Sequence, residues 1–144
     1  MLGLLAETIA LVATALFAGA AVYVSLVEHP ARESCGPAIA VAEFGPSYRR
    51  GAIMQGGLAL IGGIAGVGRW ATLGGPGWLA AGLLLLALIP YTLIVIMPTN
   101  KRLLDPALDT RSAEASALLC RWGRRHSFRT LGGCVALGIL FASR

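Results

Sequence analysis

The chain has 144 residues, of which 56% are hydrophobic and only 13% are charged. Soluble domains carry about 25% charged residues, so this composition indicates an integral membrane protein. One crossing takes about 20 apolar residues, and four crossings with short connections would use nearly all of these 144 residues, so no separate soluble catalytic domain is expected among them. The three cysteines cannot all pair with one another and lack metal-type spacing, so a disulfide framework is not expected.

Four apolar segments follow one another along the chain, at about 2–27, 51–68, 78–97 and 127–141. The first lacks the basic start of a signal peptide, so we interpret it as a retained helix. The fourth is short for a crossing, and its helix is expected to start upstream near residue 112, where helix propensity is high and proline is absent. Residues 1–144 therefore predict a single all-α domain, an integral membrane four-helix up-down bundle.

The basic residues are distributed unevenly between the two sides of such a bundle. Segments 28–50 and 98–126, together with Arg129, carry ten of the twelve Lys and Arg residues, whereas Arg69 and Arg144 lie on the side of both termini. The positive-inside rule makes the first side cytoplasmic and the termini non-cytoplasmic. For a bacterial source this predicts a multi-pass protein of the inner (cytoplasmic) membrane. The net charge of +5 is then a topology signal, and no nucleic-acid partner is expected.

The second span is rich in glycine. Gly62 and Gly66 form a small-x-x-x-small pair, which lets a neighbouring backbone approach closely. The expected complement is the run of small residues between Ala13 and Ala21 of the first span. The same face would also suit a homo-oligomer, so the pattern leaves the oligomeric state open.

Polar side chains gather at the cytoplasmic ends of the four spans. They are Glu28, His29 and Arg32 after the first span, Tyr48 and Arg49 before the second, Tyr91, Thr92, Thr99, Asn100 and Lys101 at the third, and Trp122, His126 and Arg129 at the fourth. The last three are spaced i, i+4 and i+7, which places an indole, an imidazole and a guanidinium on one helical face. If that face points inward, it makes a polar site capped by an aromatic ring.

His29 and His126 are the two histidines of the chain, and both fall at this level. A histidine can move a proton near neutral pH or ligate a metal or haem, but at an interface it can also be a helix cap. A metal site would need a third ligand such as Glu28, and neighbouring residues of a helix point about 100° apart. No metal is therefore favoured, and copper, iron or haem held by His29, His126 and Glu28 stays as an alternative.

These polar blocks give the sequence a resemblance to the anthrone oxygenase-like family of small four-helix membrane proteins, found in bacteria and in fungal polyketide clusters. The resemblance is carried by Glu28–Arg32, Tyr48–Arg49, Pro90–Thr92, Met97–Leu104 and Arg121–Arg129. The best-known members oxidise anthrones to anthraquinones, while many bacterial members have no assigned reaction. The resemblance therefore implies an oxidoreductase that acts with O₂ on an anthrone-like phenolic or polycyclic ketone.

The implied reaction fits the residue types at the cytoplasmic mouth. An anthrone has an acidic methylene, so a base can produce an electron-rich enolate that reacts with O₂ directly and requires no cofactor in principle. We expect His126 to be the base, with His29 as the alternative or second proton carrier. The residues expected to bind the substrate are Arg129, Arg49, Asn100 and Tyr48 at its oxygens and Trp122 and Tyr91 against its rings. Such a hydrophobic substrate would enter from the lipid bilayer.

Two other classes of function stay open on the sequence. One is a redox or binding protein in which the histidines hold a metal or haem. The other is a non-enzymatic structural or helper subunit, in which the polar mouth binds lipid headgroups or a partner. Substrate-dependent O₂ uptake would distinguish the oxygenase from both of these classes. Metal analysis with a visible spectrum would distinguish the metal or haem protein from the structural subunit.

Overall fold

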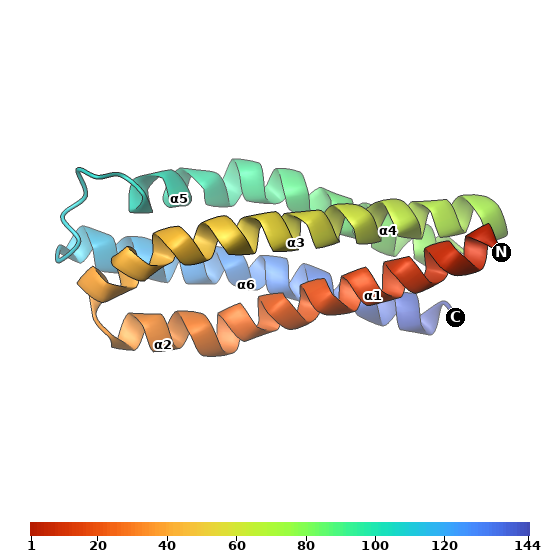
Figure 1. The fold of residues 1–144 in the computed structure, drawn as a ribbon, viewed down its shortest axis with the longest axis horizontal. Helices are drawn as coiled ribbons and strands as arrows, with labels where there is room; N and C mark the ends of the chain where they lie inside the picture. The colour runs from red at the N-terminus through yellow and green to blue at the C-terminus, as the bar shows by residue number, and fades with distance from the viewer.

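The computed structural model describes residues 1–144 and consists of helices joined by short turns and one loop (Figure 1). In chain order they are α1 (Leu2–Tyr23), the π turn η1 (Val24–Glu28), α2 (His29–Ser34), α3 (Pro37–Leu73), α4 (Pro76–Tyr91), the π turn η2 (Thr92–Ile96), α5 (Met97–Leu103) and α6 (Ala113–Ala142). The series α1–η1–α2 is continuous, as is α4–η2–α5, so the chain forms four long helices. The predicted all-α class is confirmed.

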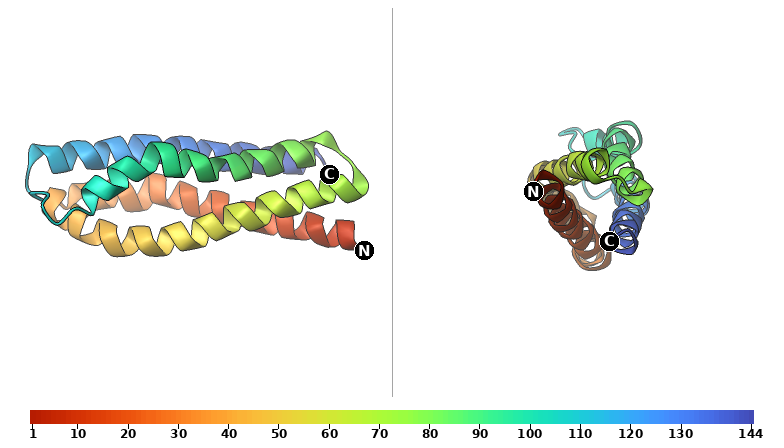
Figure 2. Two further views of the ribbon diagram at one scale, coloured as in Figure 1. Left: turned by 90° about the horizontal axis from the view of Figure 1, so that it is seen from above. Right: turned by 90° about the vertical axis from the view of Figure 1, so that its right-hand side faces the viewer.

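The four long helices run alternately up and down around one axis, as the end-on view shows (Figures 1 and 2). α1 packs against α3 and α6, and α4 packs against the same two helices, which closes the bundle. Both termini lie at one end with the α3–α4 turn, and the α2–α3 turn lies at the other end with the loop 104–112 (Figure 1). The up-down bundle is confirmed, and the membrane side of the termini stays a prediction.

Three of the long helices are long and apolar enough to cross a membrane: Leu2–Ser34, Pro37–Leu73 and Pro76–Leu103. Each exceeds the apolar run seen in the sequence, because the polar flanks continue the same helix. α6 does not belong to this group, since its first half carries three arginines, Arg121, Arg124 and Arg125. Large apolar side chains on all four helices face outward, where lipid would cover them; examples are Leu16, Ile61, Leu83 and Leu131.

Glycine lets α3 pack closely on both of its neighbours. A Cβ placed on Gly62 would lie 3.4 Å from that of Ala13 on α1, whereas one on Gly66 would lie 3.1 Å from the Cα of Gly82 on α4. The small-residue pair thus serves two interfaces, and only Gly62 meets the predicted complement on α1. The backbones approach most closely at Gly82, where a Cβ would lie 2.8 Å from the carbonyl oxygen of Gly63 and 2.9 Å from the backbone nitrogen of Val67.

We expect the substitution Gly82→Ala to destabilise the bundle by about 1–3 kcal/mol, because the added methyl meets backbone atoms of α3 that have no rotamer to change. Gly68→Ala is the matched control, since a Cβ there meets nothing within 4 Å and alanine favours a helix by about 1 kcal/mol over glycine. Thermal unfolding of the detergent-purified variants measures both effects. Equal stability of the two variants would contradict this account of the α3–α4 contact.

Ion pairs close both ends of the bundle. At the end with the termini, Arg69 Nε donates to Glu7 Oε2 at 3.1 Å and joins α3 to α1. At the other end, Arg102 donates to Glu114 at 2.7 and 3.0 Å and to Asp105 at 2.7 Å, which fixes both ends of the loop between α5 and α6. The guanidinium lowers the pKa of the Glu114 carboxyl, and a backbone N–H together with Arg102 lowers the pKa of Asp105.

The two π turns each end two residues before a proline: η1 ends at Glu28 before Pro30, and η2 ends at Ile96 before Pro98. Proline has no N–H, and its ring clashes with the carbonyl four residues earlier in an α-helix. A π turn places one extra residue in the helix at this point, and such turns recur at functional sites. Both π turns contribute residues to the wall of the cavity described next.

Candidate functional site

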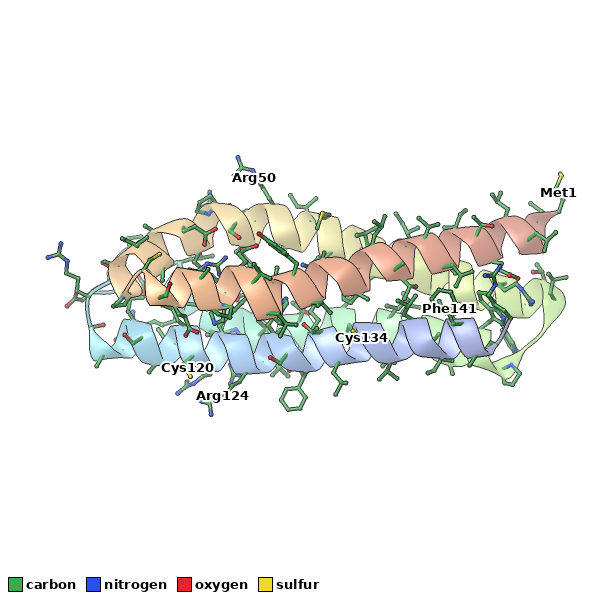
Figure 3. The ribbon with its side chains drawn as sticks, turned by 90° about the horizontal axis from the view of Figure 1, so that it is seen from below. Met1, Arg50, Cys120, Arg124, Cys134 and Phe141 are labelled. Atoms are coloured by element: carbon green, nitrogen blue, oxygen red, sulfur yellow. The ribbon has the colours of Figure 1, made fainter.

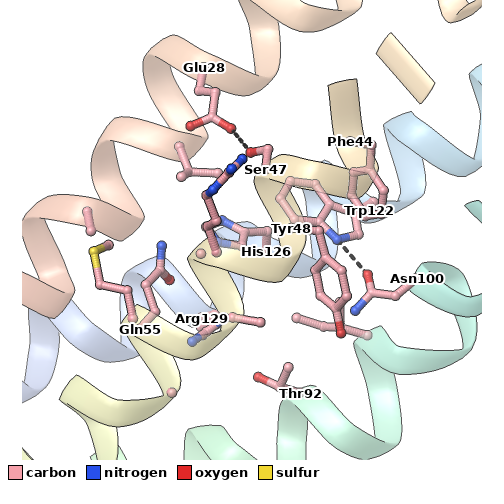
Figure 4. Close-up of a pocket in the computed structure, with 18 of the residues that line it drawn as sticks. Glu28, Phe44, Ser47, Tyr48, Gln55, Thr92, Asn100, Trp122, His126 and Arg129 are labelled. Carbon is pink, nitrogen blue, oxygen red and sulfur yellow. Dashed lines mark hydrogen bonds between the residues drawn. The ribbon is translucent and has the colours of Figure 1, made fainter. Parts of the chain in front are cut away.

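A cavity of about 660 Å³ lies between the four long helices, in the half of the bundle away from the termini (Figure 4). Much of its wall is apolar, with residues such as Ala59, Leu88 and Ile96. Every long helix supplies polar side chains to the wall, among them Tyr48 and Gln55 from α3, Thr92 from η2, Asn100 from α5, and His126 and Arg129 from α6. The site is therefore a mainly apolar space with a few polar groups directed into it (Figure 4).

α6 supplies the inner face that its i, i+4, i+7 spacing predicts. Trp122, His126 and Arg129 are all buried and line the cavity. The imidazole of His126 stacks on the indole of Trp122, with ring centroids 4.8 Å apart and planes 20° apart. Its Nδ1 atom lies 3.1 Å from Ser25 Oγ. Because the protein supplies no hydrogen-bond partner to Nε2, that nitrogen can act on a bound molecule.

Arg129 is a buried cation without a partner anion. Its side chain is 9% exposed, its Nε has no hydrogen-bond partner, and every ion pair of the chain involves other residues. Its guanidinium carbon lies 5.2 Å from the ring centroid of Phe17, a cation–π contact. A buried charge ordinarily has a paired opposite charge, so the guanidinium of Arg129 is free to pair with an anionic group in the cavity.

Two amide side chains also keep unused hydrogen-bonding groups. Asn100 is fully buried; its Oδ1 accepts from Trp122 Nε1 at 2.8 Å, while its Nδ2 has no partner (Figure 4). Gln55 is 3% exposed, and its Oε1 has no partner. Because buried polar groups are nearly always hydrogen-bonded, these two amides are the natural contacts for polar atoms of a ligand.

An ion-pair network forms one rim of the cavity and joins η1 and α2 to α3. Arg32 pairs with Glu28 and Glu43, and Ser47 Oγ donates to Glu28 at 2.5 Å. The guanidinium carbon of Arg32 also lies 5.9 Å from the ring centroid of Trp122. Arg32 is therefore neutralised by two carboxylates, in contrast to Arg129 deeper in the site.

The structure brings five of the eight predicted site residues to the cavity wall: His126, Arg129, Asn100, Tyr48 and Trp122. The other three lie elsewhere. His29 is buried behind Trp122, with ring centroids 4.9 Å apart, and its Nε2 lies 3.5 Å from Glu33. Arg49 is exposed outside the wall, and the hydroxyl of Tyr91 donates to the carbonyl of Arg125 at 3.0 Å.

The metal-ligand set considered from the sequence does not assemble. No three His, Cys, Asp or Glu side chains gather in a way that could hold a metal ion. Glu28 pairs with Arg32 and Ser47, whereas His29 lies beside Glu33. The three cysteines are exposed, and Figure 3 shows Cys120 and Cys134 on the outside of α6.

Six polar residues of the site were not expected from the sequence: Ser25, Glu43, Ser47, Arg50, Gln55 and Thr130. Gln55 lines the cavity, and Ser25 and Thr130 contact His126. A signal exists for Gln55, because it is the one amide in a glycine-rich apolar span, and polar residues inside membrane spans are expensive and mark functional sites. Ser25 and Thr130 carry no comparable signal, since serine and threonine also satisfy their own helix backbone.

Comparison with known proteins identifies the family of the chain. A family model described as anthrone oxygenase matches residues 44–139, about two-thirds of the chain. The match includes all five predicted residues that line the cavity and leaves out the Glu28–Arg32 block. No curated protein and no solved structure matches the chain. On the extent of the family match, the chain belongs to the anthrone oxygenase family.

Proposed function

We propose that this membrane protein is an oxygenase that oxidises an anthrone-like phenolic or polycyclic ketone with O₂ in the cavity. The observation that carries the proposal is the pair on α6: the unpaired cation of Arg129 lies one helical turn from His126, whose Nε2 has no partner. An uncompensated buried charge is costly, and an enolate produced beside it would supply the missing anion. The family match supports the same reaction class.

In this mechanism His126 Nε2 takes a proton from the substrate methylene. The electron pair left behind moves into the ring system and places negative charge on the carbonyl oxygen, which becomes an enolate. Arg129 and the unpartnered Nδ2 of Asn100 donate hydrogen bonds to that oxygen. The apolar wall excludes water, which strengthens these contacts at the moment when charge develops.

The enolate then reduces O₂. The methylene carbon loses two hydrogens and gains one oxygen atom, and the second oxygen atom leaves as water, so an anthrone and O₂ give an anthraquinone and water. A C–O bond forms between the methylene carbon and O₂, and the outer oxygen takes the proton from His126 Nε2 to give a hydroperoxide. The carbon then loses its second hydrogen as a proton, its electron pair forms the new C=O bond as the O–O bond breaks, and that proton joins the departing hydroxide to give water. No electron donor other than the substrate is needed for this balance.

The volume of the cavity and its aromatic wall suit a flat polycyclic molecule. Its volume lies within the range of about 300–1,000 Å³ typical of small-molecule sites. Phe44 packs edge-on against Trp122, with centroids 5.4 Å apart, and stacks on Tyr48 at 5.6 Å, which provides an aromatic wall. A substrate of this kind partitions into the lipid bilayer and would reach the site from there.

The test is O₂ consumption by the detergent-purified protein with anthrone, measured with an electrode, while the quinone is followed by mass spectrometry. We expect one O₂ per quinone and one ¹⁸O atom in the product from ¹⁸O₂, well above the autoxidation seen with heat-inactivated protein. A rate no higher than that background would overturn the proposal. Elemental analysis and a visible spectrum of the same sample test the metal or haem alternative.

A further inference from the structure

We propose that Ser25 and Thr130 are positioning residues that hold the proton of neutral His126 on Nδ1, so that Nε2 is the basic nitrogen in the cavity. The inference rests on the proposed role of His126 and deepens it. Three contacts connect the imidazole to α1: His126 Nδ1 lies 3.1 Å from Ser25 Oγ, Ser25 Oγ lies 2.7 Å from Thr130 Oγ1, and Thr130 Oγ1 donates to the Ala21 carbonyl at 3.1 Å.

The acceptors at the Thr130 end of this series of hydrogen bonds determine which atom donates in each of them. A carbonyl oxygen can only accept, and a hydroxyl has a single proton to donate. Thr130 has carbonyl acceptors at Ala21, 3.1 Å away, and at His126, 3.2 Å away, so its proton is used there. Ser25 must then donate its own proton to Thr130 and accept from the imidazole.

The opposite direction would leave oxygen atoms in contact without a proton between them. If Ser25 donated to His126 Nδ1, Thr130 would have to donate to Ser25. The Thr130 oxygen would then face the Ala21 carbonyl 3.1 Å away with no hydrogen to share. The contacts therefore favour the tautomer with its proton on Nδ1.

This tautomer has a chemical consequence for the proton transfer. A neutral imidazole has one donor and one acceptor nitrogen, so a proton held on Nδ1 leaves the lone pair on Nε2 toward the substrate. When Nε2 gains the substrate proton, the Nδ1–H of the imidazolium still donates to Ser25 Oγ. No proton moves between His126, Ser25 and Thr130. Neutral hydroxyls do this without placing a further charge inside the membrane.

The tautomer can be measured without turnover, by ¹⁵N NMR of the histidine-labelled full-length protein in detergent, with the His126 signals assigned by their loss in His126→Gln. We expect an unprotonated Nε2 and a protonated Nδ1 in the parent. In Ser25→Ala and in the near-isosteric Thr130→Val, the Nε2 signal should shift toward the protonated form. The conservative changes Ser25→Thr and Thr130→Ser should restore the parent spectrum.

The same variants give a kinetic readout. We expect kcat to fall about 10- to 100-fold in Ser25→Ala, by analogy with the loss of the hydrogen-bond partner that orients a metal-ligating histidine, with KM little changed. Ser127→Ala is the matched control, because Ser127 is an exposed hydroxyl of α6 that bonds only to its own helix. A parent protein with the proton on Nε2, or an unchanged spectrum in both Ser25→Ala and Thr130→Val, would overturn the inference. The expected tautomer in a protein that consumes no O₂ would support the inference and overturn only the proposed function.

Discussion

Replacing His126 by glutamine is expected to lower kcat for anthrone-dependent O₂ consumption by about 10²- to 10⁴-fold, the usual contribution of a positioned general base. Glutamine has a similar size and is neutral, so the cavity should keep its shape, but no basic nitrogen remains beside the substrate. The measurement is the initial rate of O₂ uptake at saturating anthrone, together with thermal unfolding to show that the variant is folded.

His29→Gln provides the comparison, because His29 is the other buried histidine and contacts the same indole from outside the cavity. We expect kcat to fall by less than about tenfold, since His29 does not line the cavity and its replacement removes no group that exchanges a proton with the substrate. If His29→Gln abolished O₂ uptake and His126→Gln did not, the assignment of the base would have to be exchanged between the two histidines.

Arg129→Met is expected to lower kcat without lowering the stability of the protein. Removing one preorganised donor to a developing oxyanion lowers kcat by about 10²- to 10³-fold. The same change removes a buried charge that has no partner, and replacing such a charge by an apolar side chain of similar volume is often neutral or stabilising. We therefore expect kcat to fall while the unfolding temperature stays the same or rises.

Arg124→Met is the matched control for this prediction. Arg124 is on the same helix but points outward, as Figure 3 shows, and it is exposed. Its replacement should leave both kcat and the unfolding temperature close to those of the parent. A variant Arg129→Met that unfolds at a lower temperature yet keeps its rate would identify Arg129 as a structural residue and remove it from the mechanism.

The sequence predicts the fold well because one physical requirement dominates three of the four helices. Apolar runs long enough to cross a bilayer must be helical there, whereas the fourth helix follows from the high helix propensity upstream of a shorter apolar run. The functional face of α6 is also predictable, because Trp122, His126 and Arg129 are polar or aromatic residues whose spacing matches a helix.

The faces of α3 and of the third long helix are less predictable. Residues 51–68 are mostly small or apolar on every side, so no polarity pattern indicates that Gln55 and Arg50, rather than Arg49, reach the cavity. Neighbouring residues on a helix point about 100° apart. That angle separates the predicted Tyr91 from Thr92, and His29 from Glu28, and in each pair only the second residue lines the site.

The π turn η1 requires a fixed number of residues between Ser25 and Pro30, but it does not require particular residue types there. Its five residues include Leu26 and Val27, which are exposed and face lipid, so many apolar side chains would serve equally well there. Deleting either one would restore an α-helical register and rotate Ser25 by about 100° relative to Pro30, which would carry its hydroxyl away from His126. In this stretch the number of residues matters more than their identity, so relatives that keep the same chemistry should tolerate substitution here but not gaps.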